Sequence, residues 1–175
     1  MKATRGAAAP DADADADTDV KVSASESDTE ALGESLAAAL SAGDVIVLEG
    51  PLGAGKTRFV AGLARGLHAR SRVRSPSFTL LNEYRGDRLL LHLDLYRLEP
   101  RDVGGLGLEE QIERGVLVAE WGEKLPEAQR RDALMLRFEI RSETARAITA
   151  RAAGPRGEAL LARWRALESR YEKEA

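Results

Sequence analysis

The feature that most constrains this chain is an eight-residue stretch matching the pattern G-x-x-x-x-G-K-[ST], Gly50-Pro51-Leu52-Gly53-Ala54-Gly55-Lys56-Thr57. A short β-branched run at 45–48 precedes it, and apolar residues at helical spacing follow it at 60–67. We therefore expect a buried strand, a glycine-rich turn and a helix. Backbone N–H groups in such a turn and at the start of the helix form a nest for phosphate. The sequence thus predicts a nucleotide phosphate site in an α/β fold.

Positions within this stretch have separate expected roles. The glycines let the backbone wrap closely around phosphate. Lys56 is expected to act as a compact charge at the β- and γ-phosphates, where a planar guanidinium would not fit in the same way. The Thr57 hydroxyl is expected to ligate Mg²⁺. The residues assigned to nucleotide binding in this segment are Gly53, Ala54, Gly55, Lys56, Thr57 and Arg58.

Two acidic residues follow apolar runs and are candidates to complete the site. Asp94 comes after the run 89–93, and Glu120 comes after the run 116–119. An acid in this position is often only the polar end of a strand, but ligands of open α/β sheets bind beyond the strands' carboxyl ends. We expect both acids at the ends of strands flanking the strand of the phosphate stretch. Lys56, Asp94 and Glu120 are the predicted catalytic residues, and Thr57, Asp94 and Glu120 the predicted metal ligands.

The order of the remaining patterns predicts a single domain. The expected class is α/β, a P-loop NTPase-like three-layer fold whose central mixed sheet has parallel core strands and added antiparallel strands. Residues 1–24 alternate Asp with Ala and are expected to be a disordered acidic leader. The P-loop domain is expected over 25–153. A C-terminal helix over 154–175 is expected to pack on this domain or extend it.

Local signals give the expected elements. A capping box of Ser27 with Glu30 predicts a helix that Gly43 ends. Strands are expected at 78–84 and 88–95, joined by a turn at 85–87, and a short helix at 108–114. Further strands are expected at 116–119, 134–140 and 145–150. Apolar residues then share one face of the terminal helix: Leu160, Trp164, Leu167 and Tyr171.

Composition excludes several classes of protein. The 175 residues include no cysteine, which removes disulfides, thiol catalysis and cysteine-bound zinc, and only two histidines, which disfavours a multi-histidine metal site. No apolar run is long enough for a membrane helix, and the amino terminus has no signal-peptide pattern, so we expect a cytoplasmic protein. Acidic excess lies in residues 1–30, leaving a nearly neutral body that disfavours bulk binding of nucleic acid.

Three further features allow two interpretations each. The hydroxyls of 75–79 meet the γ-phosphate or metal as switch loops do, or form an ordinary Ser-Pro turn. His92 is expected to pack within the sheet rather than bind a ligand. A basic run is either a solvated helix end or a contact for phosphate, a partner or tRNA: Arg65, His68, Arg70, Arg72 and Arg74.

Several segments in this order resemble the TsaE (YjeE) family of small bacterial ATPases. They are 48–57 with the phosphate stretch, 75–80 (SPSFTL), 92–98 (HLDLYRL), 106–110 (LGLEE) and 120–121 (EW), within a match of about 26–150. The resemblance implies an ATPase domain needed for threonylcarbamoyladenosine (t6A) at adenosine 37 of tRNAs reading ANN codons. It implies ATP and Mg²⁺ as cofactors, and TsaB-like and TsaD-like partners, while a separate enzyme makes threonylcarbamoyl-adenylate.

The resemblance also assigns residues. Thr57 and Glu120 would hold Mg²⁺ with Asp94 close by, the helix opening at Glu26 to Thr29 would lie near adenine, and Arg146 would approach the nucleotide. It implies weak or partner-stimulated hydrolysis, contact with tRNA through the complex, and a monomer when alone. The alternatives are a P-loop small-molecule kinase and a nucleotide-binding switch without meaningful hydrolysis. Phosphate release without a phosphorylated acceptor would separate the ATPase from the kinase.

Overall fold

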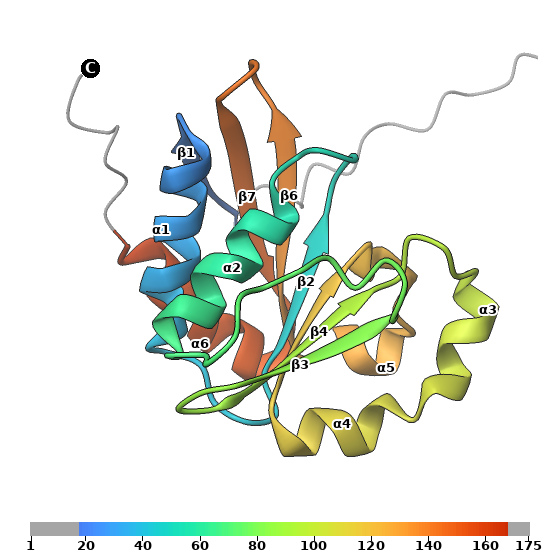
Figure 1. The fold of residues 1–175 in the computed structure, drawn as a ribbon. Helices are drawn as coiled ribbons and strands as arrows, with labels where there is room; N and C mark the ends of the chain where they lie inside the picture. Colours follow the sequence, from blue (N-terminus) through green and yellow to red (C-terminus); the bar gives the residue numbers. More distant parts are fainter. Residues whose placement is uncertain (1–17, 168–175) are drawn as a thin grey trace, which may run out of the picture.

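The computed structural model describes residues 18–167, which form a seven-stranded mixed sheet with helices on both faces (Figure 1). The strand order is β1-β7-β6-β2-β5-β4-β3. The strands are β1 (Asp19–Ser23), β2 (Val45–Glu49), β3 (Leu81–Arg85), β4 (Leu89–Asp94), β5 (Val116–Glu120), β6 (Ala133–Ile140) and β7 (Arg146–Ala152). The helices are α1 (Glu26–Ala37), α2 (Lys56–Gly66), α3 (Pro100–Val103), α4 (Leu108–Arg114), α5 (Glu127–Arg130) and α6 (Gly154–Arg165), with 3₁₀ turns at Gly104–Leu106 and Gly122–Lys124.

Parallel pairing occupies the middle of the sheet. β2 is parallel to β5 on one side and to β6 on the other, and β4 is parallel to β5. The pairs β3–β4, β6–β7 and β1–β7 are antiparallel. Every residue of β2 and β5 is buried, because parallel strands covered on both faces have no side toward solvent. The predicted α/β class, with parallel core strands and added antiparallel strands, is confirmed.

Each face of the sheet has its own apolar core, since successive side chains of a strand point to opposite faces. Ile46 and Leu48 of β2 belong to a core shared with α1, α2 and α6, which includes the fully buried Trp164. Val45 and Val47 belong to a second core shared with α3 and α4. Figure 1 shows these groups of helices on opposite sides of the sheet. Side chains that alternate along β2 therefore pack against helices on both faces of the sheet.

The helices α1 and α2 lie in close contact because glycine removes side chains from their interface. A Cβ at Gly62 would lie 1.9 Å from the carbonyl oxygen of Glu30, and one at Gly33 would lie 2.3 Å from that of Phe59. Contact this close leaves no room for a methyl group. The start of α1 is thereby brought beside the loop that precedes α2, where a Cβ at Gly55 would lie 3.6 Å from Cγ2 of Thr29.

The first part of the chain differs from expectation in two ways. The segment Asp19–Ser23, expected to belong to the leader, forms β1 because it pairs with β7; residues 1–17 lie outside the described residues. The first helix begins at Glu26, and its cap is Ser25, whose hydroxyl accepts a hydrogen bond from the N–H of Asp28 at 3.1 Å. The predicted capping box at Ser27 is therefore wrong. With β1 ending so close by, the chain enters the helix two residues earlier.

Other helix and strand boundaries also differ from those expected from the sequence. The first helix ends at Ala37 rather than near Gly43, although Leu40 is still buried in the turn that follows. Residues 78–80 form a turn instead of the start of a strand, because Leu80 has a φ of 67° and its N–H bonds the carbonyl of Pro76. The helix at 108–114 and the later strands are confirmed, whereas the turn expected at 85–87 lies at 86–88, because Arg85 still pairs with Leu89. Tyr171 lies outside the described residues.

Within residues 18–167, every helix falls short of the length and apolar character needed to cross a bilayer.

Candidate functional site

The phosphate stretch forms the loop between the carboxyl end of β2 and the start of α2. Gly50, Gly53 and Gly55 have φ values of 135°, 75° and 98°, a region that side chains other than glycine rarely adopt. Gly55 is the N-cap of α2 and supplies no side-chain cap, so no side chain at that position competes for the first helical N–H groups. The loop thus has the backbone shape and the free donors that bind an anion.

Lys56 lies inside this loop and is only 4% exposed. Its ammonium donates hydrogen bonds to the carbonyls of Gly50 at 2.6 Å and Pro51 at 2.9 Å, and lies 4.6 Å from the centre of the Trp121 ring. Burial lowers the pKa of Lys56, and the nearby carboxylates, Glu120 foremost, oppose the shift without cancelling it. Among the described residues no carboxylate lies within ion-pair distance of this ammonium. Its charge therefore stays available to an anion in the loop.

Trp121 reaches Lys56 because the chain turns sharply at the end of β5. Trp121 has a φ of 56°, a left-handed conformation that costs a non-glycine residue about 1 kcal/mol. The turn sets its ring 5.0 Å from that of Tyr96 and over the Lys56 ammonium. Two aromatic rings thus lie next to each other beside the Lys56 ammonium.

Glu120, the last residue of β5, extends its carboxylate to the start of α2. Its Oε1 accepts a hydrogen bond from Thr57 Oγ1 at 2.6 Å and lies 2.9 Å from Nε2 of His92. Burial by itself raises the pKa of Glu120, but hydrogen bonds from His92 and Thr57 and the charge of Lys56 outweigh it, so the pKa lies below its ordinary value. Glu120 is therefore ionised at neutral pH and in direct contact with Thr57.

Asp94 ends β4 and is the register partner of Glu120 in β5. The expectation that Asp94 lies on a strand flanking β2 is wrong, because β5 lies between β2 and β4. Its Oδ1 accepts a hydrogen bond from the N–H of Tyr96 at 2.9 Å, and its Oδ2 lies 3.5 Å from the hydroxyl of Ser77. The two carboxylates share one end of the sheet, with Asp94 one strand farther from the loop.

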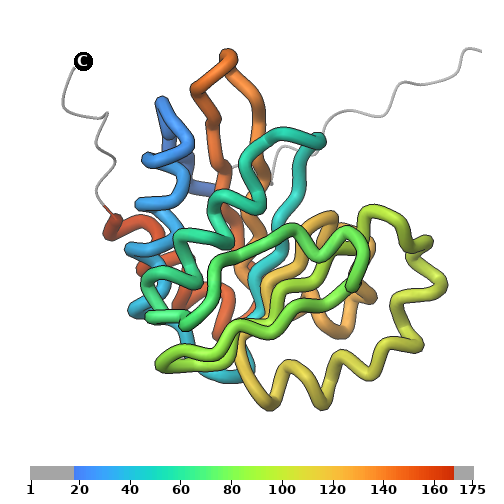
Figure 2. The backbone as a smooth tube through the Cα atoms, in the orientation of Figure 1, coloured from blue at the N-terminus to red at the C-terminus, as the bar shows by residue number. Residues whose placement is uncertain are grey.

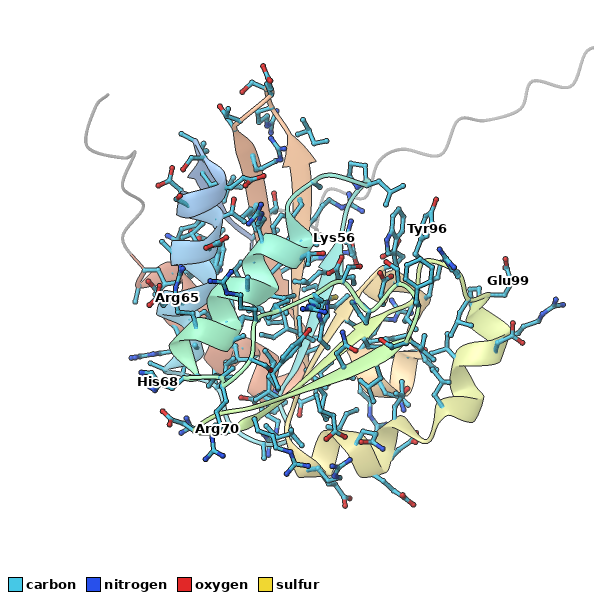
Figure 3. All side chains as sticks on the ribbon, in the orientation of Figure 1. Lys56, Arg65, His68, Arg70, Tyr96 and Glu99 are labelled. Carbon is cyan, nitrogen blue, oxygen red and sulfur yellow. The ribbon has the colours of Figure 1, made fainter. Side chains whose placement is uncertain are left out.

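Two adjoining cavities lie at Gly53 and Gly55 of the loop. The first, of about 250 Å³, contains the charged groups described above, and Figure 3 shows Lys56 and Tyr96 near each other at this end of the sheet. The second, of about 260 Å³, lies between the loop and the start of α1. Both are lined by Glu26, Gly53, Gly55 and Arg58, so they form one elongated site. Such a shape suits a ligand with a phosphate chain at one end and a larger group at the other.

The start of α1 forms one wall of the second cavity. Thr29 is buried, and its hydroxyl bonds that of Ser23 at 2.8 Å, which fixes the helix to the end of β1. Glu26 forms an ion pair with Arg58 of α2 at 2.8 Å. The segment expected from the family resemblance to lie near adenine is thus located beside the loop.

Arg146 joins the turn between β6 and β7 to the loop. Its guanidinium donates to the carbonyls of Gly53 at 3.1 Å and Ala54 at 3.2 Å, and to three carbonyls of its own turn. Figure 2 shows that this turn and the loop after β2 lie at the same end of the sheet. Because its partners among the described residues are neutral carbonyls, Arg146 brings positive charge to the second cavity.

The oxygen ligands at the first cavity suit a hard cation. In the part of the chain that the structure describes, no three His, Cys, Asp or Glu side chains gather tightly enough to hold a metal ion by themselves. Mg²⁺ in phosphate sites uses one or two protein oxygens, with phosphate oxygens and water supplying the rest. The Thr57 hydroxyl and the Glu120 carboxylate, with Asp94 beside them, fit that requirement.

Comparison with known proteins decides the family. A model of the family described as threonylcarbamoyl adenosine biosynthesis protein TsaE matches residues 23–148. A tRNA threonylcarbamoyladenosine biosynthesis protein TsaE from Bacillus subtilis is 39% identical over 135 residues, covering 76% of this chain and 85% of that protein. The chain belongs to the TsaE family.

Other TsaE relatives agree, and a solved structure shares the fold. The TsaE protein of Nostoc sp. is 52% identical over 101 residues, which span 54% of this chain but only 62% of that protein. The crystal structure of Bacillus subtilis YdiB superposes with a TM-score of 0.69 and 34% identity, covering 85% of this chain and 95% of that one. The TsaE match includes the loop, both carboxylates and Arg146, and it ends before α6.

The first part of the basic run of this TsaE chain, from Arg65 to Arg70, lies away from the loop. Arg65 bonds Glu30 at 3.1 Å and Glu34 at 2.7 Å of α1, and His68 bonds Asp87 at 2.6 Å. Figure 3 shows Arg65, His68 and Arg70 toward the end of α2 opposite Lys56. Arg70, Arg72 and Arg74 are exposed, and their contact with tRNA or a partner stays a prediction.

Sequence reasoning missed two contacts of the site. His92 is fully buried in the sheet as expected, but its bond to Glu120 was not foreseen. Its position two residues before Asp94 places both on the same face of β4, and that spacing was the available signal. The contact of Trp121 with Lys56 depends on the left-handed backbone conformation of Trp121, which no local sequence pattern predicts. Ser75 and Ser77 line the first cavity within a Ser-Pro turn closed by the carbonyl of Pro76, and contact of their hydroxyls with a γ-phosphate or metal stays a prediction.

Proposed function

We propose that this TsaE-family chain is the Mg²⁺-dependent, ATP-binding and ATP-hydrolysing subunit of a tRNA-modifying assembly with a P-loop NTPase-like fold. Family membership gives it a role in the biosynthesis of threonylcarbamoyladenosine in tRNA. In the proposal it acts at adenosine 37 of tRNAs reading ANN codons, together with TsaB-like and TsaD-like partners through which it meets tRNA. It works in the cytoplasm and is a monomer when alone.

One observation carries the proposal. Lys56 and Thr57 from the loop and Glu120 from the neighbouring strand converge on one cavity, and Thr57 bonds Glu120 directly at 2.6 Å. A phosphate nest, a buried ammonium, a hydroxyl and an ionised carboxylate are the parts that phosphoryl transfer from a nucleotide requires.

Each part has a separate task. The N–H groups of 53–57 bind phosphate oxygens, and Lys56 places its charge at the β- and γ-phosphates. Thr57 and Glu120 would hold Mg²⁺, with Asp94 beside them in the active site. When bound, Mg²⁺ supplies positive charge at the phosphate oxygens. The adenosine end of the nucleotide would occupy the second cavity, beside Glu26, Thr29 and Arg146.

The charges around the first cavity support weak hydrolysis by the chain alone. Among the described residues, Arg58 is the one arginine lining this cavity, and it is bound to Glu26 and Glu30. An arginine supplied to the transition state accelerates related enzymes by about 10³–10⁵-fold. Among the described residues, Lys56 is the other cation lining this cavity, so in the proposal a partner supplies the further positive charge that rapid hydrolysis needs.

The test is incubation of the purified chain with Mg-ATP and candidate small-molecule acceptors. We expect release of inorganic phosphate, no phosphorylated acceptor, and no release when Mg²⁺ is chelated. Transfer of the γ-phosphate to an acceptor would instead establish the kinase. Failure to bind or hydrolyse ATP, alone or with TsaB-like and TsaD-like partners, would overturn the proposal.

A further inference from the structure

We propose that His92 is a positioning residue of this site. In the proposal its imidazole donates the Nε2 hydrogen to Oε1 of Glu120 and thereby leaves Oε2 of that carboxylate open to the cavity. The inference rests on the proposed function, because Glu120 is the carboxylate assigned to Mg²⁺.

Packing alone does not explain why a histidine occupies position 92. It is fully buried within β4, where the neighbouring interior residues are Leu90, Leu91 and Leu93. A leucine would fill such a position without burying polar atoms, and burying them is unfavourable unless they are hydrogen-bonded. One ring nitrogen is satisfied by Glu120 at 2.9 Å. The hydrogen bond to Glu120 therefore explains why a polar side chain occupies this buried position.

The surroundings of the ring decide which nitrogen carries the hydrogen. Nδ1 of His92 is buried and has no hydrogen-bond partner within residues 18–167. A hydrogen on Nδ1 would be a buried donor without an acceptor, and Nε2 would then face Glu120 as a second acceptor. An ionised carboxylate only accepts hydrogen bonds, so the hydrogen belongs on Nε2.

Two hydrogen-bond donors contact the same oxygen of the Glu120 carboxylate, so its two oxygens have different surroundings. Oε1 of Glu120 is occupied by Thr57 from α2 and by His92 from β4, at 2.6 Å and 2.9 Å. Oε2 has no hydrogen bond from the described residues, and Glu120 lines the cavity. The donors approach from different elements, which fixes the plane of the carboxylate. Thr57 gives its hydrogen to Oε1, so its lone pairs stay available on the cavity side.

Two substitutions separate positioning from packing. His92→Leu preserves an apolar filling but removes the donor, whereas His92→Gln retains an amide N–H that can reach Glu120. We expect the leucine variant to fold and melt at or above the wild-type temperature. It should need about 10-fold more Mg²⁺ to bind a non-hydrolysable ATP analogue, as happens when a residue behind a metal ligand is lost. The glutamine variant should recover most of that loss, and a packing role would reverse this order.

A second measurement needs neither nucleotide nor activity. The chain has two histidines, so imidazole ¹⁵N spectra of the full chain contain two rings, and His68→Gln assigns them. We expect the His92 ring to carry a hydrogen on Nε2. A ring with a hydrogen on Nδ1 and none on Nε2, or His92→Leu with wild-type Mg²⁺ dependence, would overturn the inference. A wild-type chain that binds Mg-ATP analogue but never hydrolyses ATP would refute the proposed function while leaving both His92 measurements decisive.

Discussion

Glu120 and Asp94 are neighbouring carboxylates with different hydrogen-bond partners. Glu120 contacts Thr57 and His92 through one oxygen, and its pKa is lowered by those bonds and by Lys56 despite its burial. Asp94 is held by the backbone of the chain that follows it, one strand farther from the loop. The contacts therefore favour Glu120 over Asp94 as the direct ligand in the proposed Mg²⁺ site.

Glu120→Gln should damage hydrolysis far more than nucleotide binding. The amide keeps an oxygen that accepts from Thr57 and His92 but loses the negative charge. Nucleotide affinity should stay within about tenfold, or about 1.4 kcal/mol, because the loop N–H groups and Lys56 still hold the phosphates. Hydrolysis should fall by about 10²-fold, the scale of losing one preorganised charged group. Titration calorimetry and single-turnover phosphate release would measure both, and normal hydrolysis by this variant would remove Glu120 from the catalytic role.

Single residues of the site were predictable where chemistry is tied to a local pattern. Lys56 and Thr57 follow from the spacing of the phosphate stretch, and Glu120 follows from its position after a buried run. His92 required the register that sets β4 beside β5, which is a property of the assembled sheet. Arg146 acts through carbonyls more than ninety positions earlier in the chain, and no local signal reports such a contact.

At the scale of elements, the contact between α1 and α2 positions one wall of the proposed nucleotide site. Glycines on both helices allow the backbones to touch, and the start of α1 then closes the second cavity beside the loop. The ion pairs of Arg58 and Arg65 with α1 cross the same interface but are partly exposed, so they contribute less than the packing.

Gly62→Ala tests this contact. The new methyl group would lie 1.9 Å from the carbonyl oxygen of Glu30, which forces the helices apart. Overpacking of this kind costs about 1–3 kcal/mol, and we expect the melting temperature to fall by about 5 °C or more. Weaker nucleotide binding should accompany the loss as α1 moves away from the loop.

Gly104→Ala is the matched control for that substitution. Gly104 has a φ of −60°, and nothing lies within 4 Å of a Cβ placed there. The change should leave stability unchanged or raise it by up to about 1 kcal/mol. Equal melting temperatures for the two variants would contradict the close-packed helix interface.

Elements with a strong apolar period were predicted well, and those set by distant pairing were not. The strands β2, β5 and β6 and the helix α2 match their patterns, because burial on both faces or on one face shapes the sequence directly. β1 exposes its two valines and buries Lys21 and Ser23, so its sequence shows no apolar inner face, and its pairing with β7 depends on the assembled sheet. The first helix was misplaced by two residues, since both Ser25 and Ser27 have an acid three residues later.

At the scale of the whole molecule, the site exists only when distant segments are assembled. Its walls come from the start of α1, the loop after β2, the ends of β4 and β5, and the first residue of β7. Lys56 contributes charge to this site but few apolar contacts to either core. Replacing it should therefore remove the chemistry while the sheet and helices stay intact, which makes it the variant of choice for testing function.

The most direct test is formation of threonylcarbamoyladenosine in unmodified tRNA. The mixture contains the TsaB-like and TsaD-like partners, the enzyme that makes threonylcarbamoyl-adenylate, Mg-ATP, and either this chain or its Lys56→Ala variant, with circular dichroism verifying that the variant is folded. We predict that the wild-type chain hydrolyses ATP and supports modification, and that the folded variant does neither, because the loop has lost the charge that offsets the transferred phosphoryl group. Equal modification with the variant, or without the chain, would contradict the account.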